Sequence, residues 1–124
     1  RLRRKLLQLM DADIQAYQSK NIKKSLQVPL EVCGLCENAI ALCPALLTKG
    51  NKNLISDVAV AAALLEAAFM SASFNVGINL KSSHDARLAQ KLRKALAAKE
   101  KKIKHIRAIT EAIVGASIRG KAPR

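Results

Sequence analysis

The stretch Val58–Leu80 constrains the fold more than any other part of the chain, because its only charged side chain is Glu66. The remainder is mostly Ala, Leu and Val, with a few Ser and Asn residues. A helix of this composition is expected to be buried on nearly every face. The stretch therefore predicts a long central helix that begins near Asn53 or Ser56, ends near Lys81, and is wrapped by the other segments.

Length alone would also allow this stretch to cross a lipid bilayer. Glu66 near its middle, with Ser71, Ser73 and Asn75 in its second half, makes that placement unfavourable. We find no further hydrophobic span to accompany it. We therefore expect a buried helix of a bundle and no membrane partner.

Small residues repeat at every fourth position of this helix, at Ala59, Ala63, Ala67 and Ser71. Such a stripe lets another helix approach closely. Since four helices in one protomer would leave part of this surface uncovered, we expect a homodimer.

The composition of the whole chain favours helices. Half of the 124 residues are hydrophobic, only 2% are aromatic, and the alternating pattern typical of strands is nearly absent. This length is sufficient for one domain with a core of its own. We predict an all-α helical bundle of four main helices around the central one, forming a single domain over residues 1–124.

The boundaries of the other elements are predicted from capping and helix-breaking residues. The expected helices span about Arg1–Lys20, Val28–Gly50 and Asp85–Ile118, and Lys20–Gln27 is the expected basic loop. Pro29 suits the first turn of a helix, where its missing N–H costs nothing. Pro44 should kink or split the second helix, and Gly50 should end it.

Three cysteines, Cys33, Cys36 and Cys43, raise the question of a metal or redox site. Structural zinc needs four ligands, usually in two spaced pairs, and His84 and His105 lie far away without such spacing. A CxxC redox motif belongs in a βαβ context, which an all-α chain lacks. We expect small core residues and no metal. Three cysteines without a secretory signal favour a reducing compartment, so we expect a cytoplasmic location.

The formal charge is +13, from 22 Lys and Arg against 9 Asp and Glu. Basic residues cluster at Arg1–Lys5 and again between Lys81 and Arg107. Such a charge attracts polyanions, including nucleic acid, an anionic membrane or a small acidic ligand. No aromatic residue is interleaved with the charge to stack on bases, which disfavours nucleic acid. A solvated basic face and a face that attracts a small polyanionic ligand both remain open.

Polar residues crowd both ends of the central helix. They are Asn51, Asn53, Ser56 and Asp57 at its start, and Asn75, Asn79 and Lys81 at its end. Capping accounts for one or two of the first group, but not for two amides one turn apart in an apolar helix. Buried amides must be hydrogen-bonded or face a ligand or water. Asp13, on the apolar face of the first helix, is either an exposed neighbour or a carboxylate turned into a site.

Four blocks of residues resemble one known family. They are DIQAY at 13–17, VPLEV at 28–32, GNKNLISD at 50–57 and NVGINLK at 75–81. The chain resembles the cyclodeaminase domain of formimidoyltransferase-cyclodeaminase and its stand-alone methenyltetrahydrofolate cyclohydrolase relatives. The resemblance covers about two thirds of the chain in the right order, and the last two blocks are its most specific part.

The resemblance implies an all-α homodimer with a tetrahydrofolate substrate and no other cofactor. It also implies one of two reactions at the one-carbon bridge of that substrate. A cyclodeaminase closes 5-formimidoyltetrahydrofolate to 5,10-methenyltetrahydrofolate and releases ammonia, whereas a cyclohydrolase opens the methenyl ring with water. Both reactions need proton transfers around a tetrahedral carbon, which a positioned carboxylate can perform. The choice between them stays open.

Matched to the family motifs, Asp57 is the first candidate for acid–base catalysis and Asp13 is the second. The candidates for contacting the pterin or the folate carboxylates are Asn53, Ser56, Asn75, Asn79 and Lys81. The two ends of the central helix lie roughly 30–40 Å apart. A site that uses both is therefore expected to be long or built across the dimer. The basic surface is expected to concentrate folates, including polyglutamylated ones.

Two features depart from the family pattern. The glycine-rich N-terminal segment of relatives has no counterpart here, and the connection Lys20–Gln27 is short. Because the first residue already falls in a helical pattern, we expect further residues upstream of Arg1. A non-catalytic basic helical binding module derived from the family is the alternative. A third hypothesis, a nucleic-acid-binding helical protein, predicts steeply salt-dependent DNA or RNA binding.

Overall fold

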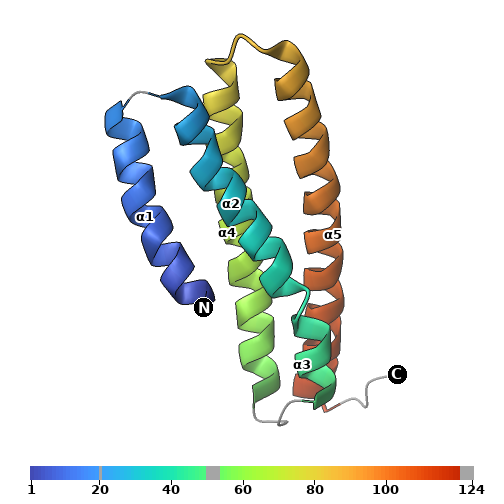
Figure 1. The fold of residues 1–124 in the computed structure, drawn as a ribbon. Coiled ribbons are helices and arrows are strands. Elements are labelled where there is room, and N and C mark those ends of the chain that lie inside the picture. Colours follow the sequence, from blue (N-terminus) through green and yellow to red (C-terminus); the bar gives the residue numbers. More distant parts are fainter. Residues whose placement is uncertain (20, 50–53, 121–124) are drawn as a thin grey trace.

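The computed structural model describes residues 1–19, 21–49 and 54–120. Five helices occur in these residues: α1 (Leu2–Ser19), α2 (Ile22–Ile40), α3 (Cys43–Lys49), α4 (Ile55–Lys81) and α5 (Ala86–Ile118). Figure 1 shows α4 and α5 side by side, α2 packed against them and α1 on the outer side of α2. The prediction of an all-α bundle with four main helices is confirmed, with α3 as a short addition.

The start of α2 differs from the prediction. Asn21 caps this helix, and its side chain accepts hydrogen bonds from the backbone N–H groups of Lys23 and Lys24 at 3.0 and 3.3 Å. The residues expected to form a basic loop are therefore helical from Ile22 onward. Pro29 consequently lies inside the helix rather than in its first turn.

The break at Pro44 was predicted correctly. α2 ends at Ile40, two turn residues follow, and α3 begins at Cys43 with Pro44 in its first turn. Pro44 has no N–H to donate to a preceding turn, so the chain restarts as a new helix. The predicted cap at Gly50 lies outside the described residues.

One continuous core holds α2, α4 and α5 together. α4 supplies Phe69 and Val76, each with no exposed surface, and α5 supplies Ile103, which is equally buried. Ala89, Leu96, Ile103 and Thr110 of α5 recur every seven residues. This spacing is typical of long helices that pack nearly in line, and it explains the slender pair that α4 and α5 form.

The expectation that α4 is buried on nearly every face is wrong for a single chain. Only one stripe of α4 faces the core, while Leu64 is 66% exposed and Phe74 is 64% exposed. Among the described residues, α2, α5 and the short α3 pack against α4, and their contacts leave these large apolar side chains exposed. The apolar composition of α4 therefore exceeds what one copy of the described bundle buries.

A second segment also matches the length and hydropathy of a membrane span. Lys23–Lys49 meets this criterion together with Ile55–Lys81, which corrects the expectation of one span only. The first segment is broken between α2 and α3. Both segments contribute to the core. Lys23–Lys49 supplies Cys33 and Ile40, and Ile55–Lys81 supplies Phe69.

Ion pairs join the helices around this core. Glu37 of α2 binds Lys99 and, at 3.3 Å, Lys102 of α5. Glu66 of α4 accepts a hydrogen bond of 2.6 Å from Nε of Arg107 in α5. The lone charge of the apolar α4 stretch is therefore explained by a partner across the helix pair.

Replacing Glu37 with Gln is expected to make the free energy of unfolding change less with pH in the acid range. The hydrogen bond from Lys99 lowers the pKa of Glu37, so this carboxylate stabilises the fold above its unfolded pKa of about 4.3 and ceases to do so as the pH falls through the folded pKa. Glu37→Gln should cost about 0.5–1 kcal/mol at pH 7 and less at pH 3, because this stabilisation is progressively lost below the unfolded pKa.

Urea unfolding at both pH values measures this difference. Glu31→Gln makes the same chemical change on the same helix, at a carboxylate that has no ion pair among the described residues. An equal loss at both pH values for Glu37→Gln would assign its effect to packing instead of charge.

Candidate functional site

Two adjoining cavities line the face of the bundle that α5 does not cover. They have volumes of about 430 and 440 Å³ and share Asp13 of α1, Pro29 of α2 and Asn75 of α4. We call the first the apolar cavity; its other lining residues are Leu6, Leu9, Met10, Val28, Val32, Ala68, Ser71 and Ala72. We call the second the amide cavity; its other lining residues are Ile14, Gln18, Ser25, Ile78 and Asn79.

The packing of α1 creates this groove. Leu9 and Ala16, two turns apart on α1, are buried, and α1 packs against α2. No α1 residue belongs to the core cluster shared by α2, α4 and α5 in the described chain. Because α1 packs mainly against α2 and does not cover α4, the surface between α1 and α4 remains open to solvent.

Asp13 lies at the junction of the two cavities. Among the residues that the structure describes, it is the only charged side chain that lines either cavity, although the chain carries a net charge of +13. The carboxylate is exposed to solvent. A single anionic group between an apolar wall and a set of amides can exchange protons with a bound molecule and also attract its hydrogen-bond donors.

Asn79 is held by the backbone of a neighbouring helix. Its side-chain NH₂ donates a hydrogen bond of 2.9 Å to the carbonyl oxygen of Ser25 in α2. Asn75, one turn earlier on α4, is exposed and lines both cavities. The two amides that composition singled out therefore lie together beside Asp13.

The residues predicted at the start of α4 lie elsewhere. Ser56 and Asp57 are exposed in its first turn, and α4 has no side-chain hydrogen bond at its N-cap. Asp57 lines a separate cavity of about 360 Å³ whose other walls are Cys43, Leu46, Leu54, Val58 and Ala61. The rise of a helix places Asp57 about 27 Å from Asn75. As expected, one chain does not bring the two ends of α4 into one cavity.

The remaining predicted contacts are outside the groove. Lys81 is exposed at the last residue of α4 and lines neither cavity. Asn53 lies outside the described residues. Sequence reasoning missed Ser25, Pro29 and Gln18, of which only Pro29 carried a detectable signal, a proline within a run of helix-forming residues.

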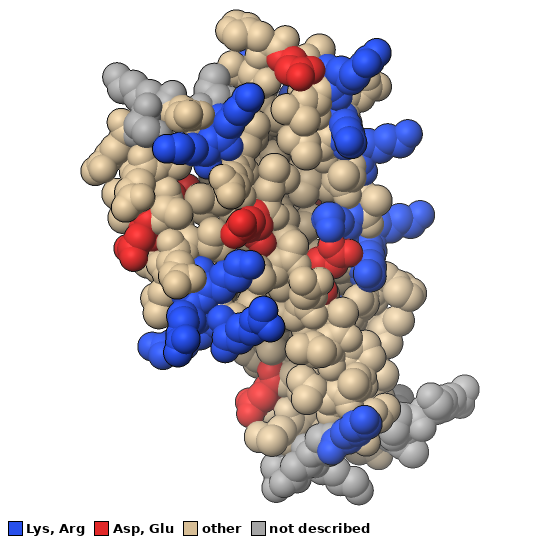
Figure 2. Space-filling view, viewed as in Figure 1, with Lys and Arg blue, Asp and Glu red and all other residues tan. Residues whose placement is uncertain are grey.

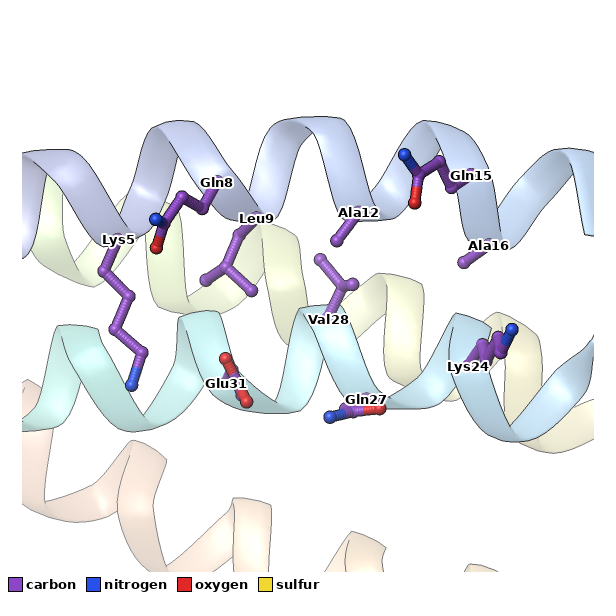
Figure 3. A pocket seen from close by; sticks show the side chains of 10 residues that line it. All are labelled: Lys5, Gln8, Leu9, Ala12, Gln15, Ala16, Lys24, Gln27, Val28 and Glu31. Atoms are coloured by element: carbon purple, nitrogen blue, oxygen red, sulfur yellow. The ribbon is translucent and has the colours of Figure 1, made fainter.

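A third groove lies between α1 and α2 and is more polar. It has a volume of about 380 Å³, and Figure 3 shows Leu9 of α1 and Val28 of α2 at the seam between the helices. Its polar walls carry Lys5, Gln8, Gln15, Lys24, Gln27 and Glu31. Charges of both signs line this groove, whereas Asp13 is the one charged residue described in the walls of the other two cavities.

The cysteines take no part in these cavities except for Cys43 beside Asp57. All three are free and buried, which confirms that they are core residues. Burial raises the pKa of each thiol, that of Cys33 to about 11. Few of these thiols are thiolates near neutral pH, so they are weak nucleophiles.

Residues 18–98 match the formiminotransferase-cyclodeaminase family, which is about two thirds of the chain. The chain belongs to this family. The resemblance based on the GNKNLISD and NVGINLK blocks is thereby confirmed. The matched range contains Asp57, Asn75 and Asn79 and begins after Asp13.

A curated relative of this family member is a methenyltetrahydrofolate cyclohydrolase from Methylorubrum extorquens. The two sequences are 37% identical over 75 residues, which are 60% of this chain. The alignment covers 36% of the relative, so the chain spans about a third of the length of the protein that it matches.

Proposed function

We propose that this family member is a folate-dependent one-carbon enzyme that acts on the bridge between N5 and N10 of tetrahydrofolate. The observation that carries the proposal is the position of Asp13, between an apolar cavity and an amide cavity. The name of the curated relative supports a tetrahydrofolate derivative as substrate. The reaction is either hydrolysis of the 5,10-methenyl compound or ring closure of the 5-formimidoyl compound.

The two cavities suit the two ring systems of a folate. In this arrangement the pterin lies in the amide cavity and the aminobenzoyl ring lies in the apolar cavity, against Leu6, Leu9 and Val32. The one-carbon bridge joins these rings and therefore comes to the junction, beside Asp13 and Asn75. We propose Asp13 as the acid–base group and Asn75 as a hydrogen-bonding neighbour of the reacting carbon.

Either reaction gives this carboxylate a defined task. In hydrolysis, water adds to the methenyl carbon while a base takes its proton, and the carbon–N5 bond then breaks as N5 is protonated. In ring closure, N10 attacks the formimidoyl carbon, and ammonia leaves after the amino group is protonated. Each path moves a proton to and from a tetrahedral intermediate, so one carboxylate can act first as base and then as acid.

The charge of the surface suggests where the glutamate tail lies. The apolar cavity reaches Leu6, next to the basic cluster Arg1–Lys5 at the start of α1. Figure 2 shows Lys and Arg gathered over this end of α1 and along α5. With the aminobenzoyl ring in the apolar cavity, the tail leaves toward this cluster. We propose that polyglutamylated folates bind there through charge, which salt screens.

A spectrophotometric assay at the absorbance of the methenyl compound tests the reaction. Loss of absorbance from 5,10-methenyltetrahydrofolate is expected for hydrolysis, and gain from 5-formimidoyltetrahydrofolate is expected for ring closure. The apparent KM for a polyglutamylated substrate should rise with salt more steeply than that for the monoglutamate. A folded chain that catalyses neither reaction would contradict the proposal and favour a non-catalytic module.

We also propose a homodimer that uses the uncovered face of α4. Val60, Leu64, Phe74 and Ile78 are each more than half exposed and recur along one side of this helix. An apolar surface of this kind is characteristic of a protein–protein contact. Light scattering is expected to give twice the mass of the chain at micromolar concentration, and a monomer mass would contradict the proposal. If Asp57 acts in the same site as Asp13, it must come from a second copy of the chain.

A further inference from the structure

The contact between Asn79 and Ser25 originates in Pro29. In a continuous helix the N–H of residue 29 would donate to the carbonyl of Ser25, four residues earlier. Proline has no N–H, so this carbonyl lacks its helical partner. The NH₂ group of Asn79 donates to the same oxygen at 2.9 Å, from a helix 54 residues away along the chain. The proline of α2 thus provides a fixed acceptor for the amide of α4.

This contact sets which way the amide of Asn79 faces. A carbonyl oxygen can only accept, so the NH₂ group must be the one directed at Ser25. The Oδ1 atom of Asn79 is thereby left as an acceptor, and no described group donates to it. Because Asn79 lines the amide cavity, a molecule bound there meets an acceptor of fixed orientation.

The other walls of the amide cavity favour the same kind of ligand. Within the described part of the chain no Lys or Arg lines the cavity and its one charged side chain is Asp13, so these walls disfavour anionic groups. Ile14, Ile78 and Pro29 supply apolar surface. An uncharged planar ring whose edge carries N–H donors fits these walls. The pterin of a folate has such an edge, formed by its 2-amino group and the neighbouring ring N–H.

We infer that Asn79 is a specificity-determining residue that accepts a hydrogen bond from the amino edge of the bound pterin through Oδ1. Ser25 holds the amide in place, and Pro29 makes the Ser25 carbonyl available. This inference rests on the proposed function, because it places the pterin in the amide cavity. It assigns substrate recognition to Asn79 and leaves the proton transfers to Asp13.

The experiment compares the binding of 5-formyltetrahydrofolate with that of its 2-desamino analogue by titration calorimetry. A site built to bond a donor rejects the analogue that lacks it, so the purified wild type should prefer the intact compound at least about tenfold. Asn79→Ala should bring the two dissociation constants to within about twofold by weakening binding of the intact compound.

Pro29→Ala provides a second, independent variant. It restores an N–H that competes with Asn79 for the Ser25 carbonyl, so the preference should fall while Asn79 itself is unchanged. Asp13→Asn should keep the preference. Gln27→Ala, on the α2 surface that lines the third groove, is the matched control and should also keep it. Circular dichroism verifies that each variant is folded.

Three results would overturn the inference: equal affinities in the wild type, an undiminished preference in Asn79→Ala and Pro29→Ala, or no binding of either compound. The reaction is judged separately by turnover. Preference without turnover would reject the proposed reaction and retain the role of Asn79. Turnover without a preference for the intact compound would support the proposed reaction and reject the role of Asn79.

Discussion

Replacing Asp13 with Asn is expected to lower kcat by about 100- to 10,000-fold, which is the usual contribution of one acid–base group. The substitution keeps the shape of the side chain and removes its capacity to take up and return a proton. KM should change much less, because the walls of both cavities remain intact. Steady-state kinetics with the methenyl substrate, or with the formimidoyl substrate if that is the one turned over, measures both constants.

Asp11→Asn is the matched control for this experiment. Asp11 lies two residues earlier on α1, is exposed, and lines neither the apolar nor the amide cavity. It undergoes the same loss of one negative charge and should keep wild-type turnover. If Asp13→Asn also kept wild-type turnover, the acid–base role of Asp13 would be refuted.

Asp57→Asn decides between the two carboxylates that the sequence singled out. A large loss in kcat for Asp57→Asn, with Asp13→Asn unaffected, would move the chemistry to the other end of α4. Large losses for both would support a site that is shared between two copies. Circular dichroism separates these outcomes from a loss of folded protein, since Asp57 lies in the first turn of α4 and stabilises its N-terminus by charge.

Phe69→Ala is expected to lower the free energy of unfolding by about 3–5 kcal/mol. Phe69 is fully buried at the centre of α4, and its carbonyl oxygen lies 3.9 Å from Sγ of Cys33 in α2. Removing the ring leaves a cavity where α2, α4 and α5 meet, and packed helices collapse into such a cavity only in part. Urea unfolding, followed by circular dichroism, measures the loss.

Phe74→Ala makes the identical change five residues along the same helix. Phe74 is 64% exposed, so the variant should lose less than about 1 kcal/mol at concentrations where the chain is monomeric. A loss that increases with protein concentration would instead place Phe74 in the contact between two copies. Equal losses for the two variants at every concentration would contradict the assignment of Phe69 to the core.

The sequence alone located α1, α4 and α5 because their signals are local. Asp85, for example, accepts a hydrogen bond from the N–H of Leu88 at 3.0 Å, as expected of a residue that precedes a helix. The start of α2 was missed because Pro29 was interpreted as a first-turn residue. The Ser25 carbonyl that this proline leaves without an N–H donor is bonded by Asn79, 54 residues along the chain from Ser25. No local sequence pattern reveals that hydrogen bond.

The candidate site was predictable in part for the same reason. Asn75 and Asn79 stood out because amides are rare in an apolar helix. That Asp13 joins them, and Asp57 does not, depends on how α1 packs against α2. The incomplete coverage of α4 was expected from its composition, but composition does not show which side of the helix its neighbours leave exposed.

The position of α1 has a thermodynamic consequence. One wall of the groove belongs to α1, and none of the α1 side chains that the structure describes is part of the core cluster. This helix should therefore detach at a lower free-energy cost than α2, α4 or α5. A ligand that touches both α1 and α4 binds only while α1 is docked, and its binding free energy therefore stabilises that docking. Affinity for the substrate and the order of the first helix are, in this protein, two measures of one equilibrium.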